Sequence, residues 1–133
     1  MRIVLDTNVL ISGVLFSGPP ARILDASRIG TVQFVTSPEI LTEYSEVVAS
    51  LSHDFPKVPV RRIIEMIAVH AEMVAAPPLV NSVCADPDDD KFLACALAAG
   101  VKTIVSGDKH LLQVSGYEGI QVMRPSRFIS ECL

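Results

Sequence analysis

Acidic residues stand at four separated places where a folded sheet can bring them together. Asp6 and Asp108 each follow a short apolar, β-branched run, and Glu43 and Asp90 lie on expected helices. In open α/β sheets, sites form at the carboxyl ends of the strands. A cluster of carboxylates with only oxygen ligands suits Mg²⁺ or Mn²⁺. Such a metal activates water and stabilises developing charge, which is the chemistry of phosphodiester hydrolysis.

Three of these acids also have a structural explanation. Asp6 and Asp108 can cap the helices that follow them. Glu43 lies close to the edge of the apolar stripe of its helix, where it can reach over the sheet. It can equally be a solvated glutamate whose stem covers the core.

The run CADPDDDKF contains four aspartates, of which three are explained by a helix start. Asp86 is a good N-cap before a proline, and Asp88 and Asp89 complement the positive end of the helix. Asp90 lies past the capping positions and points along a partly buried side, where a carboxylate needs a cation or hydrogen-bond donors. We therefore predict that Asp90 is the metal ligand of this run.

The strands and helices that must position these acids alternate along the chain. This alternation predicts one α/β domain over residues 1–133, a three-layer sandwich whose mostly parallel central sheet of four to five strands has helices on both faces. Strands are expected at residues 2–6, 31–36, 72–76, 101–108 and 119–123, with a break at the prolines of SGPP (17–20). Helices are expected at residues 8–16, 21–30, 37–51, 61–73, 87–98, 110–115 and 125–133.

The composition of the chain argues against several classes of protein and of binding site. The net charge of −4 argues against broad electrostatic adhesion to nucleic acid, although a local basic rim remains compatible with it. The 3 cysteines form no CxxC pair and the 3 histidines are scattered, which favours reduced thiols in the cytoplasm and disfavours a Cys/His zinc site. No apolar run is long enough to span a membrane, and the N-terminus is a poor signal peptide. Aromatic residues are 5% of the chain, so no base-stacking platform is evident.

Four stretches in order resemble the PIN-domain ribonucleases, especially the VapC-like toxins of bacterial and archaeal toxin–antitoxin pairs. They are RIVLDTNVLISGVL, TSPEILTEYSEVV, CADPDDDKFLACALAAG and TIVSGDKHLL, and the resemblance runs from residue 2 to about 128. It implies a Mg²⁺- or Mn²⁺-dependent endoribonuclease, usually a homodimer, that a cognate antitoxin holds inactive. The catalytic, metal-binding acids that it implies are Asp6, Glu43, Asp90 and Asp108.

The resemblance also implies auxiliary residues. Asn8 and Ser106 match positions that orient ligands or water, and Asp86 and Asp89 are acidic in the same branch. His110 replaces a second acid of many relatives; it can weaken a second metal site, lie near the scissile phosphate, or be a surface histidine without a role.

RNA would need cations around an acidic pocket. The expected contacts are Lys91 and Lys109, each beside a predicted ligand, together with Arg61, Arg62 and Lys57 of the loop before the fourth helix. Two other functions remain open from sequence: a PIN-like module that binds RNA or protein without cutting, and an RNA-processing nuclease without an antitoxin. The motifs of haloacid-dehalogenase-like phosphatases, receiver domains and glycine-rich nucleotide-binding loops are missing.

Overall fold

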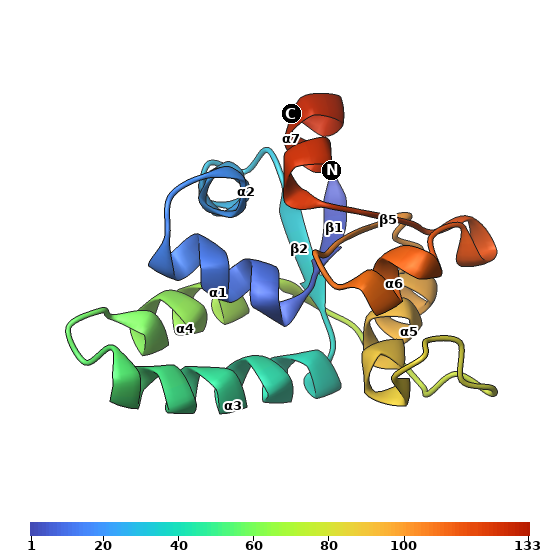
Figure 1. The fold of residues 1–133 in the computed structure, drawn as a ribbon, viewed down its shortest axis with the longest axis horizontal. Helices are drawn as coiled ribbons and strands as arrows, with labels where there is room; N and C mark the ends of the chain where they lie inside the picture. Colours follow the sequence, from blue (N-terminus) through green and yellow to red (C-terminus); the bar gives the residue numbers. More distant parts are fainter.

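A computed structural model describes residues 1–133 and shows a central sheet between two groups of helices (Figure 1). The sheet has 5 strands in the order β3-β2-β1-β4-β5, and every pairing is parallel. This arrangement confirms the predicted α/β class with a sheet that is entirely parallel. The strands are β1 (Arg2–Leu5), β2 (Gln33–Thr36), β3 (Glu72–Met73), β4 (Thr103–Val105) and β5 (Gln121–Met123).

Helices cover both faces of the sheet, as predicted. Figure 1 shows α1 to α4 on one side of the strands and α5 and α6 on the other. The helices are α1 (Thr7–Leu15), α2 (Pro19–Arg28), α3 (Pro38–Asp54), α4 (Val60–His70), α5 (Asp90–Ala99), α6 (Lys109–Gln113) and α7 (Pro125–Cys132), with short 3₁₀ turns η1 (Pro87–Asp89) and η2 (Tyr117–Gly119).

Two helix starts differ from the prediction. Pro19 and Pro20 do not stand in a break but open α2, since proline needs no N–H partner in a first turn. The helix expected over 87–98 is divided into the 3₁₀ turn η1 and then α5, so its register begins at Asp90. This division decides which aspartate of the acidic run faces which way.

The order of the strands places β1 at the centre of the sheet, with β4 beside it. The chain runs from β1 outward through β2 to β3, returns to β4 beside β1, and then continues to β5. Ligands of open α/β folds bind where the strand order reverses in this way. Leu5 pairs with Val105, so Asp6 and Ser106 follow side by side at the carboxyl edge. The backbone N–H of Asp6 donates to the carbonyl of Val105 at 3.0 Å.

The core explains why the central strands are continuously apolar. Ile3, Val4 and Leu5 are buried because helices cover both faces of the sheet. On one face, α5 packs against β1, β2 and β4 and buries Phe92 and Leu93. The apolar layers thus fix the strands whose ends carry the polar residues.

The helices α1 and α2 pack closely against each other. A Cβ atom at Gly13 would lie 2.7 Å from Cδ1 of Leu24 and 2.9 Å from the carbonyl oxygen of Pro20, so the approach of the two helices requires glycine there. No single helix of the chain is long and apolar enough to cross a membrane. The pair α1 and α2 would be, by length and composition only, and it is bent by 92°.

Candidate metal centre

Asp6 is held between the ends of β1 and β4. Its side chain is buried, and its Oδ2 atom accepts a hydrogen bond of 2.6 Å from the Ser106 hydroxyl. The Ser106 oxygen in turn accepts the backbone N–H of Asp108 at 3.0 Å. Burial, followed by the negative charges of Asp108 and Glu43, raises the pKa of Asp6, while the Ser106 hydrogen bond opposes this. The charged form of Asp6 therefore gains from any added cation.

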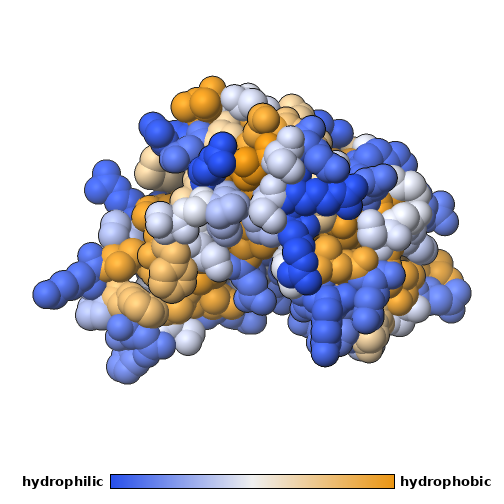
Figure 2. Space-filling model, turned by 45° about the horizontal axis from the view of Figure 1, so that its top comes forward, coloured by the Kyte–Doolittle hydropathy of each residue, from blue (hydrophilic) through white to orange (hydrophobic).

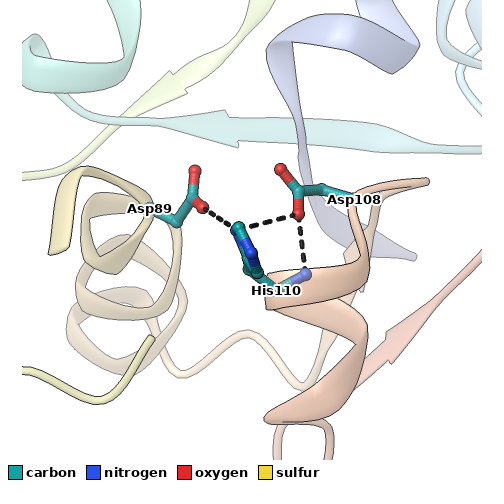
Figure 3. A group of neighbouring side chains, drawn as sticks. All are labelled: Asp89, Asp108 and His110. Carbon is teal, nitrogen blue, oxygen red and sulfur yellow. Dashed lines mark hydrogen bonds and ion pairs between the residues drawn. The ribbon is translucent and has the colours of Figure 1, made fainter. Parts of the chain in front are cut away.

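Asp89, Asp108 and His110 form a group at the same edge (Figure 3). One atom from each, a carboxylate oxygen or a ring nitrogen, lies within 4.8 Å of the others. The Nδ1 atom of His110 is 3.8 Å from Oδ2 of Asp89 and 3.7 Å from Oδ1 of Asp108. Figure 3 shows Asp89, at the junction of η1 and α5, facing Asp108 and His110 at the start of α6.

The two aspartates of this group are held differently. Asp108 is the N-cap of α6, and its Oδ1 accepts the backbone N–H of His110 at 2.7 Å. Asp89 makes no side-chain cap hydrogen bond. Burial first, then the charges of Asp108, Asp86 and Asp6, raise the pKa of Asp89 to about 6, although His110 acts in the opposite direction. Asp89 is thus a crowded carboxylate without a protein donor.

Asp90 lies outside this group. Its carboxylate accepts the backbone N–H of Cys84 at 2.8 Å and that of Val83 at 3.3 Å. Partial burial works to raise the pKa of Asp90, but hydrogen bonds, led by that from Cys84, outweigh it and lower the pKa. Asp90 is half-buried, as expected, and of the two partners expected for it, a cation or hydrogen-bond donors, the structure shows donors. The donors that a buried carboxylate requires are supplied by the loop before η1 rather than by a cation.

The other two aspartates of the run begin the helix, as predicted. Asp86 caps η1, and its Oδ1 accepts the N–H of Asp88 at 3.0 Å. Asp86 and Asp88 are both exposed. Asp88 also pairs with Lys91 at 3.1 Å, so it binds the neighbouring cation rather than the edge of the sheet.

Glu43 extends from α3 to the starts of α5 and α1, where it contacts Lys91 and Thr7. Its Oε1 is 2.8 Å from Nζ of Lys91, and its Oε2 accepts a hydrogen bond from the Thr7 hydroxyl. Partial burial disfavours the charge on Lys91, but hydrogen bonds with Glu43 and Asp88 outweigh it and raise the pKa of Lys91. The ammonium is therefore already engaged with carboxylates, in contrast to the free RNA contact that the sequence predicts.

The remaining predicted residues differ in their distance from the centre. Asn8 and Lys109 are exposed and adjoin the ends of β1 and β4. Arg61 and Arg62 lie in the first turn of α4, with Lys57 in the loop before it. Figure 1 shows this tip of the α3–α4 hairpin far from α5 and α6. These three cations are not brought to the acidic centre.

Two supporting residues were not predicted from the sequence. Arg124 follows β5 at the same sheet edge, and its guanidinium donates to the Gly107 carbonyl at 3.4 Å. The rule that identifies Asp6 and Asp108, a polar residue directly after a strand, would also have found it. Tyr44 is buried and donates its hydroxyl to the carbonyl of Leu5, next to Asp6. In the sequence Tyr44 stands among the apolar positions of its helix, so nothing there indicated this hydrogen bond.

The carboxyl edge of the sheet opens at the surface between the two groups of helices. In Figure 1 the chain runs downward through β1 and β2 and reaches α1 and α3 below them. Figure 2 shows a notch in the lower outline, with hydrophilic residues along its rim.

Comparison with known proteins identifies the family. A model described as a PIN domain matches residues 2–110. The chain belongs to the PIN-domain family. None of the curated protein sequences compared with it matches significantly.

Two solved structures share the fold of this PIN domain. One is PAE2754 from Pyrobaculum aerophilum, with a TM-score of 0.62 and 12% identity over 97% of this chain and 87% of that chain. The other is VapBC2 from Rickettsia felis bound to a DNA fragment from their promoter, with a TM-score of 0.54 and 12% identity over 93% of this chain and 98% of that chain. At this identity the likeness concerns the fold.

The acidic centre of the PIN domain fits a divalent cation by its donor set. Asp89 and Asp108 offer carboxylate oxygens on facing elements, and His110 adds a ring nitrogen within the same 4.8 Å limit. Burial first, and then the neighbouring carboxylates, raise the pKa values of Asp6 and Asp89, so the charged forms of both are disfavoured in the protein without a cation. Carboxylates favour Mg²⁺ and Mn²⁺, and an imidazole is more compatible with Mn²⁺ than with Mg²⁺.

Proposed function

We propose that this PIN domain is a Mg²⁺- or Mn²⁺-dependent endoribonuclease that hydrolyses RNA phosphodiester bonds with water. The observation that carries the proposal is the facing pair Asp89 and Asp108, where the Asp89 carboxylate accepts no hydrogen bond from the protein. The family and the fold support it. When bound, the cation activates water and stabilises charge on the phosphate.

Asp6, Asp89 and Asp108 are the proposed ligands, with Glu43 at the border of the centre. Asp89 replaces Asp90 of the predicted set because the Asp90 oxygens are occupied by backbone N–H groups. Ser106 orients Asp6 through its 2.6 Å hydrogen bond, which is the auxiliary role expected for it.

The chain's own cations complete the site. Lys109 is exposed beside Asp108, and Arg124 is exposed at the end of β5. We propose that both contact the phosphates of a bound RNA strand, where they would offset the repulsion between RNA and an acidic protein.

The test is cleavage of a labelled, structured RNA in Mg²⁺ or Mn²⁺. We expect Asp89→Asn and Asp108→Asn each to lower the cleavage rate by about 100-fold or more, the scale for loss of one positioned electrostatic group. Asp90→Asn is the matched control, since it removes a neighbouring charge outside the facing pair. It should retain most of the activity at temperatures where it is folded.

Two results would change the conclusion. If the wild type cuts no better than Asp89→Asn in either ion, the protein is not a nuclease of this kind, and a non-cutting module that binds RNA or protein becomes the better hypothesis. If folded Asp90→Asn is as inactive as Asp89→Asn, the ligand belongs at Asp90.

A protein partner is the second part of the proposal. The likeness to VapBC2 supports a role as the toxin of a toxin–antitoxin pair, held inactive by an antitoxin. The homodimer that the sequence resemblance implies stays a prediction. Side chains of Phe16, Ile29 and Val80 are exposed, and such apolar residues are available to a partner. We expect the product of an adjacent gene to co-purify with this chain and to suppress RNA cleavage. Unaltered cleavage would favour an RNA-processing nuclease without an antitoxin.

A further inference from the structure

Lys91 joins the two sides of the acidic centre. It lies in the first turn of α5, and its ammonium nitrogen is 2.8 Å from Oε1 of Glu43 on α3. The same nitrogen is 3.1 Å from Oδ1 of Asp88. The Lys91 side chain is only 16% exposed, so the ammonium has a fixed place between these carboxylates.

The carboxylates of the centre fall into two groups by their partners. Both oxygens of Glu43 are bonded, one to Lys91 and the other to the Thr7 hydroxyl. Asp89 receives no hydrogen bond, and it faces Asp108 with only His110 between them. The Lys91 ammonium therefore serves the side of Glu43, and on the side of Asp89 the only basic group in contact is the His110 ring, which is charged only when protonated.

We propose that the Lys91 ammonium takes the position beside Glu43 in place of a second divalent cation, so that the centre binds a single divalent cation on the side of Asp89 and Asp108. This inference rests on the proposed metal-dependent function. An ammonium is a compact charge with three donors, so it can neutralise Glu43 and Asp88 together as a metal ion would. In two-metal sites the ions stand about 4 Å apart. A second ion at Glu43 would have to displace Lys91 or share its oxygen with a like charge.

The test is the number of Mn²⁺ ions bound per chain, measured by titration calorimetry and by the electron paramagnetic resonance signal of free Mn²⁺. We expect one ion for the wild type and two for Lys91→Met, which keeps an unbranched side chain only one atom shorter but removes its charge. The second ion should be lost again in Lys91→Met combined with Glu43→Gln. Lys109→Met is the matched control, since it removes an exposed lysine beside the same centre, and should bind one ion.

The outcomes separate this inference from the proposed function. Two ions in the wild type, or one ion in folded Lys91→Met, would overturn the role of Lys91. Lys91→Arg keeps a positive charge and should bind one ion. Two ions in that variant would also contradict the proposed role of the Lys91 charge. A wild type that binds no Mn²⁺, or an ion that remains in both Asp89→Asn and Asp108→Asn, would instead overturn the metal centre itself.

Discussion

Two adjacent aspartates are expected to affect stability in opposite directions. Asp89 faces other carboxylates and accepts no hydrogen bond, whereas Asp90 accepts backbone N–H groups from Val83 and Cys84. In the metal-free protein at pH 8, Asp89→Asn should raise the free energy of unfolding and Asp90→Asn should lower it. The two changes are chemically identical and one residue apart, so each controls for the other.

The size of the Asp89 effect follows from its raised pKa. A tenfold change in proton affinity is worth about 1.4 kcal/mol, so a rise from 3.8 to about 6 corresponds to at most roughly 3 kcal/mol. Because the folded protein binds this proton more tightly than the unfolded chain does, stability falls as the pH rises from 3.8 to about 6, and the loss is complete above that pH. The gain from asparagine should be about 1–3 kcal/mol at pH 8 and should vanish near pH 4.

The Asp90 effect has the opposite sign. Its lowered pKa means that the charged form is stabilised by folding, and this contribution is lost as the pH falls below the ordinary range of aspartate. Asparagine keeps one acceptor oxygen but loses the charge, which should cost about 1–2 kcal/mol at neutral pH.

Thermal unfolding in EDTA, followed by circular dichroism between pH 4 and pH 8, measures both effects. For a chain of this length, 1 kcal/mol shifts the Tm by about 3–5 °C. We expect Asp89→Asn to unfold about 3–15 °C above the wild type at pH 8, and Asp90→Asn below it. Two results would refute this reasoning. One is an Asp89→Asn variant that is less stable than the wild type at pH 8. The other is a gain in Tm at pH 4 that equals the gain at pH 8.

Three further predictions concern the support of the centre. Ser106→Ala removes the donor to Asp6 and should weaken Mn²⁺ binding by about 10-fold in calorimetry; unchanged affinity would show that the hydroxyl does not orient the ligand. Tyr44→Phe removes the hydrogen bond to the Leu5 carbonyl and should lower the free energy of unfolding in urea by about 1–2 kcal/mol; equal midpoints would contradict this. Gly13→Ala places a Cβ within 2.7 Å of a facing side chain and should cost about 1–3 kcal/mol, so a raised Tm would disprove the close packing of α1 on α2.

The fold could be predicted largely from the sequence because its signals are local. Short β-branched runs, the Ser37 N-cap and the prolines mark strands and helix starts without knowledge of distant contacts. The position of Asp6 and Asp108 after β1 and β4 follows from the same pattern. The first turn of α2 was missed because two prolines after a glycine are equally typical of a break.

The facing direction of Asp89 and Asp90 could not be predicted from helical periodicity. The 3₁₀ turn η1 advances fewer residues per turn than an α-helix, so counting from Pro87 gives the wrong phase at the start of α5. The donors to Asp90 come from residues 83 and 84, whose place depends on the folded loop. Likewise, Lys91 appears in sequence as a free cation, and only the position of α3 shows that it is paired.

The hydrogen bond between Ser106 and Asp6 joins residues that are 100 positions apart. While the chain is being synthesised, Asp6, Glu43 and Asp89 are all made before β4, the strand that completes the edge on which they meet. Contacts this distant in sequence also form slowly during folding. A nascent chain therefore carries most of the acids without a centre to hold them. Any chemistry of the centre begins only after β4 has paired with β1.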